Sequence, residues 1–485
     1  MSDANVQAKT KPAWDPADVH ATKLPPLFSL RWTSRSLSMA IANIVLMQLT
    51  FYLTDIQGLD PVIIGGLMLA AKIFDAFSDL VASYIEDHTH TRWGKARPYE
   101  LCIIPVWVTI VILFSTPDMS DFGKYVYIFV TYVLLSGVFM TFLNTQDSTY
   151  LRRSLRGGSR ISKVLSRKGV LQMLLSGLGH AALPQLIVLW GEEPGGWTKI
   201  TLVYAIPMTI IGLIRCLTIK ELPEEVLNAT QSQKELDKAA RKAAEPKIDL
   251  KTSIKTLFSN RYMWMVAGMV MVCHFAINVV SAVNTHFFKY VVGDIGFMSY
   301  VSIIGLLPTF LVLLMPVAIK KIGAMGFIRI GLIVAFVGYG IVGLFSHILP
   351  LVIVGQVMGS MGTGLFTTFS SFFVIQCMSY GEWKTGYKLE AMMDAMPSFA
   401  NKIAQGLSAT IAGFGLAAVG FDSTLETQSA FTQGGLTVMV SLVPILFVAI
   451  ALVLSQMYRK LDKNIMKVDE DLAAGIHADT SNLKL

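Results

Sequence analysis

Charged residues are scarce in this sequence. Only 15% of its 485 residues are Asp, Glu, Lys or Arg, whereas 53% are hydrophobic. Soluble domains carry roughly 25% charged residues, so this composition excludes an ordinary soluble protein and indicates one that is dissolved in a lipid bilayer. The net charge is +7. Because the basic excess lies in loops between apolar segments, we interpret it as a topology signal and expect no nucleic-acid partner.

Cysteine is also rare and forms no motif. Four cysteines, Cys102, Cys216, Cys273 and Cys377, lie inside apolar stretches without C-x-x-C spacing. We therefore expect neither a disulfide framework nor a zinc site. The sequence also lacks H-E-x-x-H, G-x-S-x-G and P-loop motifs. These absences predict that the protein is not an enzyme and needs no metal or cofactor other than a coupling ion.

Long apolar runs, in contrast, recur along the chain. A membrane-spanning helix needs about 20 mostly apolar residues, and twelve segments meet that description. They cover residues 34–55, 61–86, 99–117, 123–150, 169–190, 199–219, 262–290, 297–319, 325–347, 349–378, 390–419 and 435–458. A polar stretch separates the sixth segment from the seventh. The pattern predicts an all-α membrane protein with twelve transmembrane helices in two six-helix bundles.

The same pattern predicts the domain limits and the orientation. In order, we expect a cytosolic N-terminal segment (1–33), an N-terminal bundle (34–219), a cytosolic linker (220–261), a C-terminal bundle (262–458) and a cytosolic tail (459–485). Loops after even-numbered segments are basic, as Arg92, Lys95 and Arg97 illustrate, whereas opposite loops carry acids such as Asp55 and Asp118. Because cytosolic loops collect Lys and Arg, both termini are expected in the cytosol, and no signal-peptide pattern precedes the first segment.

The second segment carries three charges near its middle. Lys72, Asp75 and Asp79 are three and four residues apart, so they share one helix face. Each charge costs roughly 2.5–3.5 kcal/mol at the centre of a membrane helix, which points to a function. With Ser78 beside them, the carboxylates form an oxygen-rich site suited to Na⁺ or Li⁺, or they hold a proton. The alternative is a buried ion-pair network without a ligand.

The eleventh segment offers partner charges. Glu390, Asp394, Ser398 and Lys402 recur every four residues along one helix face. We expect Lys402 to lie opposite the acids of the second segment and to couple the two bundles electrostatically, with Asp394 as a further coupling charge. The alternative is a local contact of Lys402 with Asp394 or Ser398.

The fourth segment is polar enough to line a cavity. It contains Thr141, Asn144, Asp147 and Ser148. Asn144 and Asp147 share a helix face. Asp147 is expected either to belong to the coupling charges or to pair with Arg152 or Arg153 at the end of the helix. His180 and, in the seventh segment, Asn278 are weaker signals of the same kind.

Four stretches of sequence carry a family resemblance. They are Lys72-Ile-Phe-Asp-Ala-Phe-Ser-Asp79, Asp87-His-Thr-His-Thr-Arg-Trp-Gly-Lys-Ala-Arg-Pro98, His286-Phe-Phe-Lys-Tyr-Val-Val-Gly293 and Tyr380-Gly-Glu-Trp-Lys-Thr-Gly386. Two bundles whose central cavity opens alternately to each side are the plan of the major facilitator superfamily. Within it, the chain resembles the glycoside-pentoside-hexuronide:cation symporters, of which melibiose permease is the best-known member. The resemblance covers nearly the whole membrane domain.

The resemblance implies a cation site on the second segment. It assigns Asp75 and Asp79, helped by Thr141 and Lys402, to the coupling cation. Ser78 stands where the sodium-using melibiose permease has Asn. Coupling to Na⁺ and coupling to H⁺ therefore both stay open.

The implied sugar contacts depart from the melibiose pattern. They are Asn144, Ser148, either Arg167 or Lys168, Ser398, Asn401 and Lys402. Met39 and Asn144 stand where the permease has sugar-binding carboxylates, and Ser148 where it has a stacking Trp. Because carboxylates bind sugar hydroxyls as paired acceptors, we expect a glycoside other than melibiose, including an anionic, uronide-like one.

The loop after the second segment matches a cytosolic loop of the superfamily. Arg92, Lys95 and Arg97 are expected to bond the carbonyls at helix C-termini, and Asp87, when the cytosolic side closes. They would act as a gate latch. As basic residues of a cytosolic loop, they also help to fix the orientation of the chain in the membrane.

Together these inferences predict a symporter that imports a carbohydrate with a monovalent cation by alternating access. The expected surroundings are membrane lipid in a bacterial inner membrane, crossed many times. We expect a monomer, because one chain supplies both bundles. The alternative is a lysolipid or other amphiphile transporter of the same superfamily, and a non-transporting membrane sensor is a third hypothesis.

Overall fold

The first half of the molecule begins at α1. The computed structural model describes residues 23–24, 27–89, 91–155, 158–223, 258–306, 321–386, 390–474 and 476–478. The elements before the linker are α1 (Phe28–Leu46), α2 (Leu49–Phe51), η1 (Tyr52–Ile56), α3 (Pro61–Asp87), η2 (Arg97–Cys102), α4 (Ile103–Leu113), α5 (Asp121–Val133), η3 (Leu134–Met140), α6 (Thr141–Thr145), α7 (Asp147–Ser154), α8 (Gly158–Trp190) and α9 (Gly196–Thr218).

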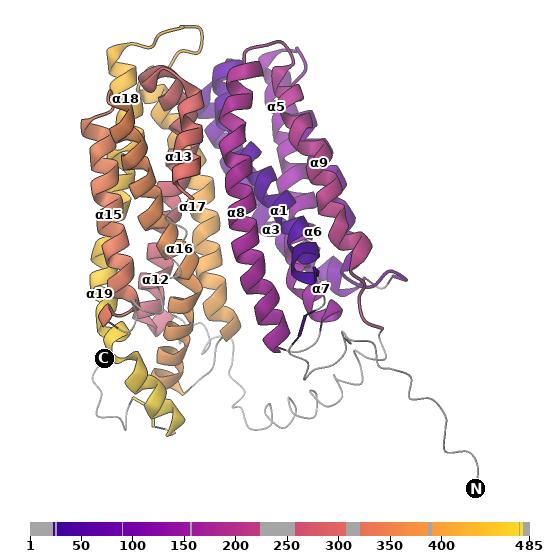
Figure 1. The fold of residues 1–485 in the computed structure, drawn as a ribbon, viewed down its shortest axis with the longest axis vertical. Coiled ribbons are helices and arrows are strands. Elements are labelled where there is room, and N and C mark those ends of the chain that lie inside the picture. The colour runs from indigo at the N-terminus through magenta and orange to yellow at the C-terminus, as the bar shows by residue number, and fades with distance from the viewer. Residues whose placement is uncertain are drawn as a thin grey trace.

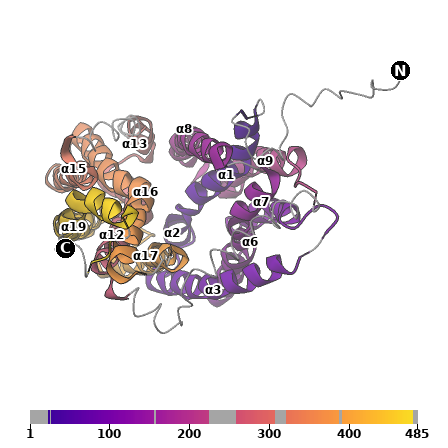
Figure 2. The same ribbon diagram turned by 90° about the horizontal axis from the view of Figure 1, so that it is seen from below.

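The second half contains the remaining helices. They are α12 (Arg261–Phe287), η4 (Phe288–Val292), η5 (Ile295–Phe297), α13 (Met298–Ile304), α15 (Ala324–Leu344), α16 (Leu349–Thr385), α17 (Glu390–Ala418), α18 (Ala430–Val440) and α19 (Leu442–Ala473). Helices α1 to α9 lie together on one side of the molecule and helices α12 to α19 on the other (Figures 1 and 2). Each half has its own hydrophobic core.

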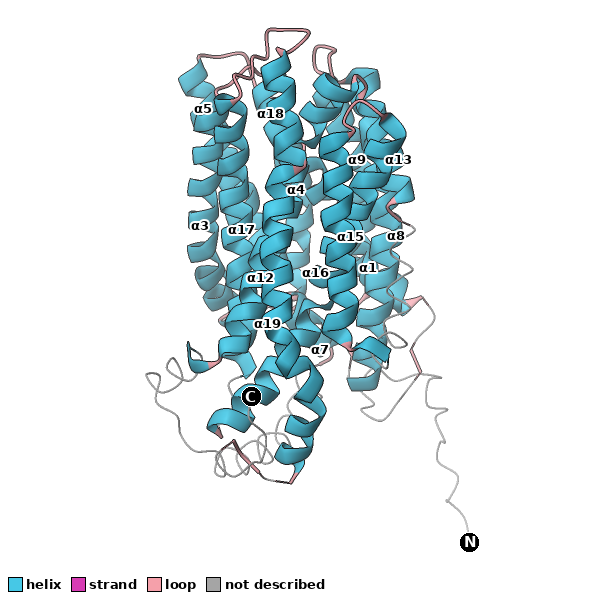
Figure 3. Cartoon of the chain, turned by 90° about the vertical axis from the view of Figure 1, so that its left-hand side faces the viewer, coloured by secondary structure: helices cyan, strands magenta, loops and turns pink. Residues whose placement is uncertain are grey.

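The long helices run side by side along one axis (Figure 3). Helix α1 begins and α19 ends at the same end of the molecule (Figure 1), which we call the terminal end; the opposite one is the far end. In the described ranges, nine helical stretches are long and apolar enough to cross a membrane. The predicted segment 99–117 corresponds to η2 and α4, and the segment 390–419 corresponds to α17. These helices are not among the nine stretches. Much of the predicted segment 297–319 lies outside the described residues.

Helix α8 starts earlier than the hydropathy pattern predicts. The apolar run begins near residue 169, but the helix begins at Gly158, so Arg167 and Lys168 are helical and not part of a loop. Residues 159–168 contain neither Pro nor Gly to end the helix. A helix end marks where helix-breaking residues occur, whereas the apolar run marks only where lipid contact begins.

Close packing of α15 on α16 depends on glycine. A Cβ atom added at Gly362 would lie 2.0 Å from the Gly331 carbonyl oxygen, and one at Gly355 would lie 2.6 Å from the Gly338 carbonyl oxygen. Small residues let membrane helices approach until their backbones touch. This seam holds two helices of the second half together without any charge.

Candidate substrate and cation site

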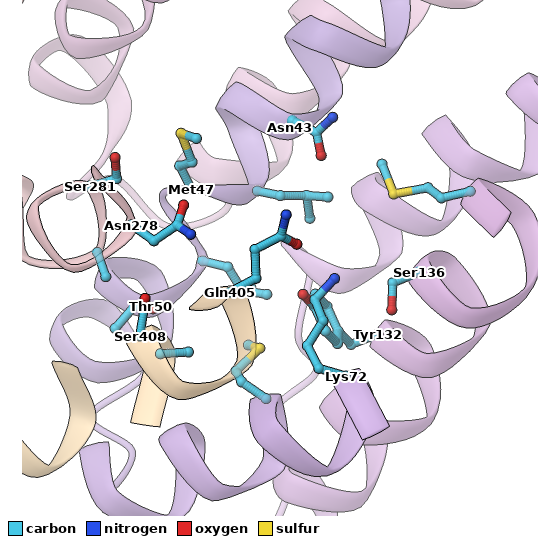
Figure 4. A pocket seen from close by; sticks show the side chains of 16 residues that line it. Asn43, Met47, Thr50, Lys72, Tyr132, Ser136, Asn278, Ser281, Gln405 and Ser408 are labelled. Carbon is cyan, nitrogen blue, oxygen red and sulfur yellow. The ribbon is translucent and has the colours of Figure 1, made fainter. Parts of the chain in front are cut away.

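A cavity of about 310 Å³ lies between the two halves (Figure 4). Helices α1, α2, α3, α5 and η3 line it from the first half, and α12 and α17 from the second. Its lining residues are Asn43, Leu46, Met47, Leu49, Thr50, Met68, Lys72, Tyr132, Ser136, Met140, Asn278, Ser281, Ala282, Gln405, Ser408 and Ala409. Amides and hydroxyls supply most of the polar atoms, and these groups both donate to and accept from sugar hydroxyls.

The two acids of α3 converge on one hydroxyl. The Thr141 Oγ1 atom lies 3.0 Å from Asp75 Oδ1 and 3.4 Å from Asp79 Oδ1. Lys72 Nζ lies 3.5 Å from Asp75 Oδ2, and Lys402 Nζ of α17 pairs with Asp79 Oδ2. Each carboxylate therefore directs one oxygen at a lysine and the other at the shared hydroxyl. Lys402 reaches across the two halves to do so.

The Ser78 side chain does not point at the two carboxylates but bonds to the backbone of its own helix. Its hydroxyl donates to the backbone carbonyl of Asp75 at 2.9 Å. Such a bond to the preceding turn holds the side chain against its own helix. Thr141 is thus the neutral oxygen group that lies between the acids, and a role of Ser78 in cation binding stays a prediction.

The residues expected to bind sugar are scattered in this structure. Asn144 and Ser398 are exposed and Asn401 is partly exposed, and none of the three lines the cavity of Figure 4. The side chains of Ser148, Asp394 and Asp87 lie outside the described part of the chain. Their functional assignments remain predictions.

The cavity instead brings together three amides, of which the sequence had indicated only Asn278, as a weak signal. Asn43 lies one helical turn after Met39, the position to which the resemblance assigned a sugar contact. Gln405 lies three residues after Lys402, and Asn278 projects from α12 (Figure 4). The helical spacing from Met39 and Lys402 was the available signal, since residues three or four apart share a face.

A buried charge network occupies the terminal end of the first half. Asp147 binds three cations: Arg35 Nη2 at 2.5 Å, Arg215 Nη1 at 2.6 Å and Lys168 Nζ at 2.9 Å. The Glu100 carboxylate accepts from Arg215 Nε at 2.7 Å and is fully buried. These five residues, Arg35, Glu100, Asp147, Lys168 and Arg215, are called the Arg35–Arg215 network below.

Aromatic rings and an amide complete this network. The Arg215 guanidinium lies 4.3 Å from the centroid of the Trp32 ring, a distance at which the ring face attracts a cation. Gln146 also donates to Glu100. A buried charge is tolerated only when it is paired and hydrogen-bonded, and the network meets both conditions.

The network bears on two alternatives left by the sequence, and a role of Asp147 in charge coupling stays a prediction. Asp147 contacts Arg35, Arg215 and Lys168, whereas Arg153 pairs with Glu221 at 2.5 Å. The expected pairing of Asp147 with Arg152 or Arg153 is therefore not found among the described residues. Of the two candidate cations on α8, Lys168 faces inward and Arg167 is exposed.

Sequence spacing gave no sign of this network. Arg35, Glu100 and Arg215 lie at the ends of three different predicted segments, where charged side chains usually extend to the membrane surface. Glu100 and Arg215 are 115 residues apart. Pairing over such a distance becomes visible only once the helices are packed.

The predicted latch loop is held by the first residues after α9. The Glu221 carboxylate accepts from the backbone N–H groups of Ala96 and Arg97, both at 2.8 Å. The Arg97 side chain donates to the Cys216 carbonyl near the end of α9 at 2.8 Å, a bond of the kind expected for a latch but within the first half. Gly94 has a φ of +117°, and a Cβ there would overlap Glu221.

The far end joins the halves through a second set of polar contacts. Asp55 in η1 binds Lys289 Nζ at 2.7 Å and the Tyr290 hydroxyl, both from η4. Nearby, Thr54 Oγ1 lies 2.9 Å from His286 Nε2. Both η1 and η4 are π-helical turns, which are frequent at functional sites. The sequence suggested only that Asp55 marks an acidic loop.

Backbone contacts reinforce the same end. The Thr410 hydroxyl of α17 donates to the Gly65 carbonyl of α3 at 3.1 Å, and Gln185 of α8 donates to the Gly296 carbonyl of η5 at 3.0 Å. Most hydrogen bonds and ion pairs that join the two halves in the described chain thus lie toward the far end, with the Lys402–Asp79 pair nearer the terminal end.

A family model described as MFS/sugar transport protein matches residues 35–462. The chain belongs to this family. The match runs from α1 to α19 and takes in both halves, and it confirms the resemblance to glycoside-pentoside-hexuronide:cation symporters.

Two relatives of this MFS sugar transporter cover nearly its whole length. The isoprimeverose transporter of Lactiplantibacillus pentosus is 29% identical over 481 residues, which cover 96% of this chain and 95% of that one. The glucuronide carrier protein homolog of Escherichia coli strain K12 is 26% identical and covers 86% of this chain and 88% of its own length.

Solved structures share the fold at low identity. A bacterial homolog of the human lysosomal transporter Spinster, in an inward-facing and unoccupied conformation, matches with a TM-score of 0.60 at 12% identity, covering 91% of this chain and 96% of that one. The D-xylose-proton symporter matches with a TM-score of 0.57 at 14% identity, covering 87% and 96%. The protein is therefore a multi-pass inner-membrane transporter with the major facilitator fold, and its family and relatives are transporters, not enzymes.

Proposed function

We propose that this MFS sugar transporter is a cation-coupled symporter that imports a glycoside by alternating access. In this proposal the chain has twelve transmembrane helices in two bundles of six, with both termini in the cytosol. The cavity between the halves holds the glycoside, and the α3 acids hold Na⁺ or H⁺.

One observation carries the proposal: Lys72 belongs to both sites. Its side chain lines the cavity and its ammonium lies 3.5 Å from Asp75. A cation that neutralises Asp75 weakens the hold of that carboxylate on Lys72. The ammonium is then available to the solute in the cavity, so each ligand favours binding of the other. Such reciprocity is the coupling free energy that symport needs.

The shared hydroxyl supports a cation between the acids. Thr141 has one proton, so it satisfies only one of the two carboxylate oxygens at a time. Two carboxylates that face one another repel, and a bound Na⁺ or an added proton removes that repulsion. Binding therefore tightens the contact between α3 and α6 next to the cavity.

The lining of the cavity favours a sugar over an acyl chain. Asn43, Asn278 and Gln405 present amides, and Lys72 is the charged side chain among the lining residues. The names of the two relatives describe carriers of isoprimeverose and of glucuronides, so a glycoside with or without a carboxylate is the substrate class to test. A lysolipid carrier would need a more apolar lining.

Uptake into membrane vesicles under separately imposed Na⁺ and H⁺ gradients tests the proposal. We expect concentrative uptake of labelled isoprimeverose or of a labelled glucuronide with one of the two gradients. Asp75→Asn should reduce the accumulation ratio at least tenfold and leave downhill exchange. Asp118→Asn, in an exposed loop, is the matched control and should accumulate normally. Undiminished accumulation by Asp75→Asn, or uptake of a lysolipid without any glycoside, would overturn the proposal.

A further inference from the structure

A second, basic pocket lies at the terminal end of the second half, remote from the transport site. It has a volume of about 550 Å³, and its lining residues come from the start of α15 and from α19, two helices that lie side by side (Figure 1). Four cationic side chains line it: Lys321, Arg329, Arg459 and Lys463. A single carboxylate, Asp462, lies among them, so positive charge predominates.

The Asp462 carboxylate forms a hydrogen bond with the backbone. Asp462 Oδ2 accepts from the Met325 N–H at 3.0 Å, in the first turn of α15. Gly323, with a φ of +79°, leaves room for it, since a Cβ there would lie 2.7 Å from Asp462 Oδ2. Asp462 thus caps a helix and forms no ion pair with the surrounding cations in the described chain.

In the described part of the chain, the cations lack protein partners. Within the residues that the structure describes, none of the four forms a hydrogen bond or an ion pair. Arg329 Nε is buried and finds no acceptor among the described residues. A buried donor without an acceptor costs roughly 1–3 kcal/mol, so an acceptor that enters the pocket would be stabilising.

A comparable turn in the first half, at Gly94, has protein acceptors for its cations. There, Glu221 plays the capping part of Asp462 and binds the loop at Gly94, which like Gly323 has a positive φ. In that half, Arg97 bonds the Cys216 carbonyl and Arg153 pairs with Glu221. A turn with a positive-φ glycine and a carboxylate that accepts from nearby backbone N–H groups therefore occurs in both halves. Among the described residues, the cations beside it have protein acceptors in the first half and none in the second.

The pocket is also amphiphilic. Ile322 and Ile330 line it beside the cations, and they are 49% and 52% exposed. Free inorganic phosphate gains nothing from apolar side chains, whereas a phospholipid contacts both a cation and an aliphatic group at the membrane surface. Basic pockets between helix ends are suited to anionic headgroups.

We propose that this pocket binds the phosphate of an anionic phospholipid. The headgroup accepts hydrogen bonds from Arg329 and Arg459, Lys321 and Lys463 add charge, and the two isoleucines contact the start of an acyl chain. The bound lipid would hold α15 against α19 independently of solute transport.

The test measures lipid binding by the purified full-length chain in detergent. Native mass spectrometry with added phosphatidylglycerol, phosphatidylcholine or inorganic phosphate separates the possible ligands. We expect phosphatidylglycerol to bind at least tenfold more tightly than phosphatidylcholine, and inorganic phosphate not to displace it. Arg329→Gln combined with Arg459→Gln should weaken phosphatidylglycerol binding at least tenfold.

Two variants distinguish a site from general charge. Lys460→Gln removes one exposed charge from the same helix outside the pocket and should change binding less than twofold. Arg329→Gln alone should weaken binding, and Arg329→Lys, which keeps the charge, should weaken it less. If the double variant does not fold, Arg459→Gln alone, at an exposed position, carries the test. Equal binding of both lipids, displacement by inorganic phosphate, or an equal loss in Lys460→Gln would overturn the proposal.

Discussion

The two halves of this transporter share an architecture but differ in what they bury. The charged residues buried in the described chain all belong to the first half; they are Arg35, Asp55, Glu86, Glu100, Arg160 and Arg215. Both halves bury aromatic rings, and the described part of the second half does so without a buried Asp, Glu, Lys or Arg. There, Tyr262 lies 4.7 Å from Tyr380 and 5.8 Å from Tyr458, measured between ring centroids, in edge-on contacts.

This difference indicates that the two halves differ in their sensitivity to charge. A network of buried charges is sensitive to the gain or loss of a single charge, because each partner depends on the others. Packed rings and glycine seams have no comparable dependence on charge. We infer that the first half responds to the cation and that the second acts as a stiffer body, which contributes Lys402 at the contact between the halves.

Of the variants considered, removal of Arg215 should have the largest effect on the stability of the protein. Arg215→Met leaves Glu100 buried without its main partner, which typically destabilises a protein by about 3–5 kcal/mol. Unfolding of the purified protein by SDS in mixed micelles measures the change. Arg167→Met, on the exposed side of α8, should alter stability by less than about 0.5 kcal/mol. Similar effects of the two variants would show that the network does not stabilise the first half.

The glycine seam of the second half should be the next most sensitive. Gly362→Ala places a methyl group against the Gly331 carbonyl, and overpacking of this kind costs about 1–3 kcal/mol. The same unfolding assay applies. Gly364→Ala is the control on the same helix, because a Cβ there meets nothing within 4 Å. A stable Gly362→Ala protein would mean that α15 and α16 separate easily.

Loss of the shared hydroxyl should weaken cation binding without unfolding the protein. Thr141→Val removes the hydroxyl oxygen that is placed to contact a cation between the two acids. Losing one such contact with a charged group costs about 1.5 kcal/mol, so the cation concentration for half-maximal uptake should rise about tenfold. Thr141→Ser keeps the hydroxyl and should remain near the original value. Equal behaviour of the two variants would remove Thr141 from the site.

The smallest effect is expected for a hydrogen bond in the second half. Tyr458 donates to Gln376 Oε1 at 2.9 Å, and hydrogen bonds between membrane helices average about 0.6 kcal/mol. Tyr458→Phe should therefore change the free energy of unfolding by about that amount and leave uptake unaltered. A loss as large as that of Arg215→Met would erase the contrast between the halves.

Much of the fold could be predicted from hydropathy because lipid imposes a length on each helix. The segment predicted at 61–86 is α3 (Pro61–Asp87), whose start is fixed by Asp60 as the capping residue and Pro61 at the first position. The segment predicted at 390–419 is α17 (Glu390–Ala418). Helix ends outside the apolar run, as at Gly158, carry no such signal.

The site was only partly predictable for a related reason. The spacing of Lys72, Asp75 and Asp79 places them on one helical face, so the sequence alone predicted that these charges lie together. Asn43 and Gln405 are neutral, and neutral amides in membrane helices resemble ordinary packing residues until a cavity is seen between them. The pairing of Arg35 with Asp147 spans 112 residues, a relation that only tertiary structure fixes.

The contact of Asp55 with Lys289 and Tyr290 has a consequence for the transport cycle. In the alternating access proposed above, solute from the far end would enter only after this contact has separated, because η1 and η4 belong to opposite halves. A carboxylate and an ammonium would then be rehydrated in every turnover. The empty carrier should accordingly rest with its vestibule facing the terminal side, and higher ionic strength should shorten that rest.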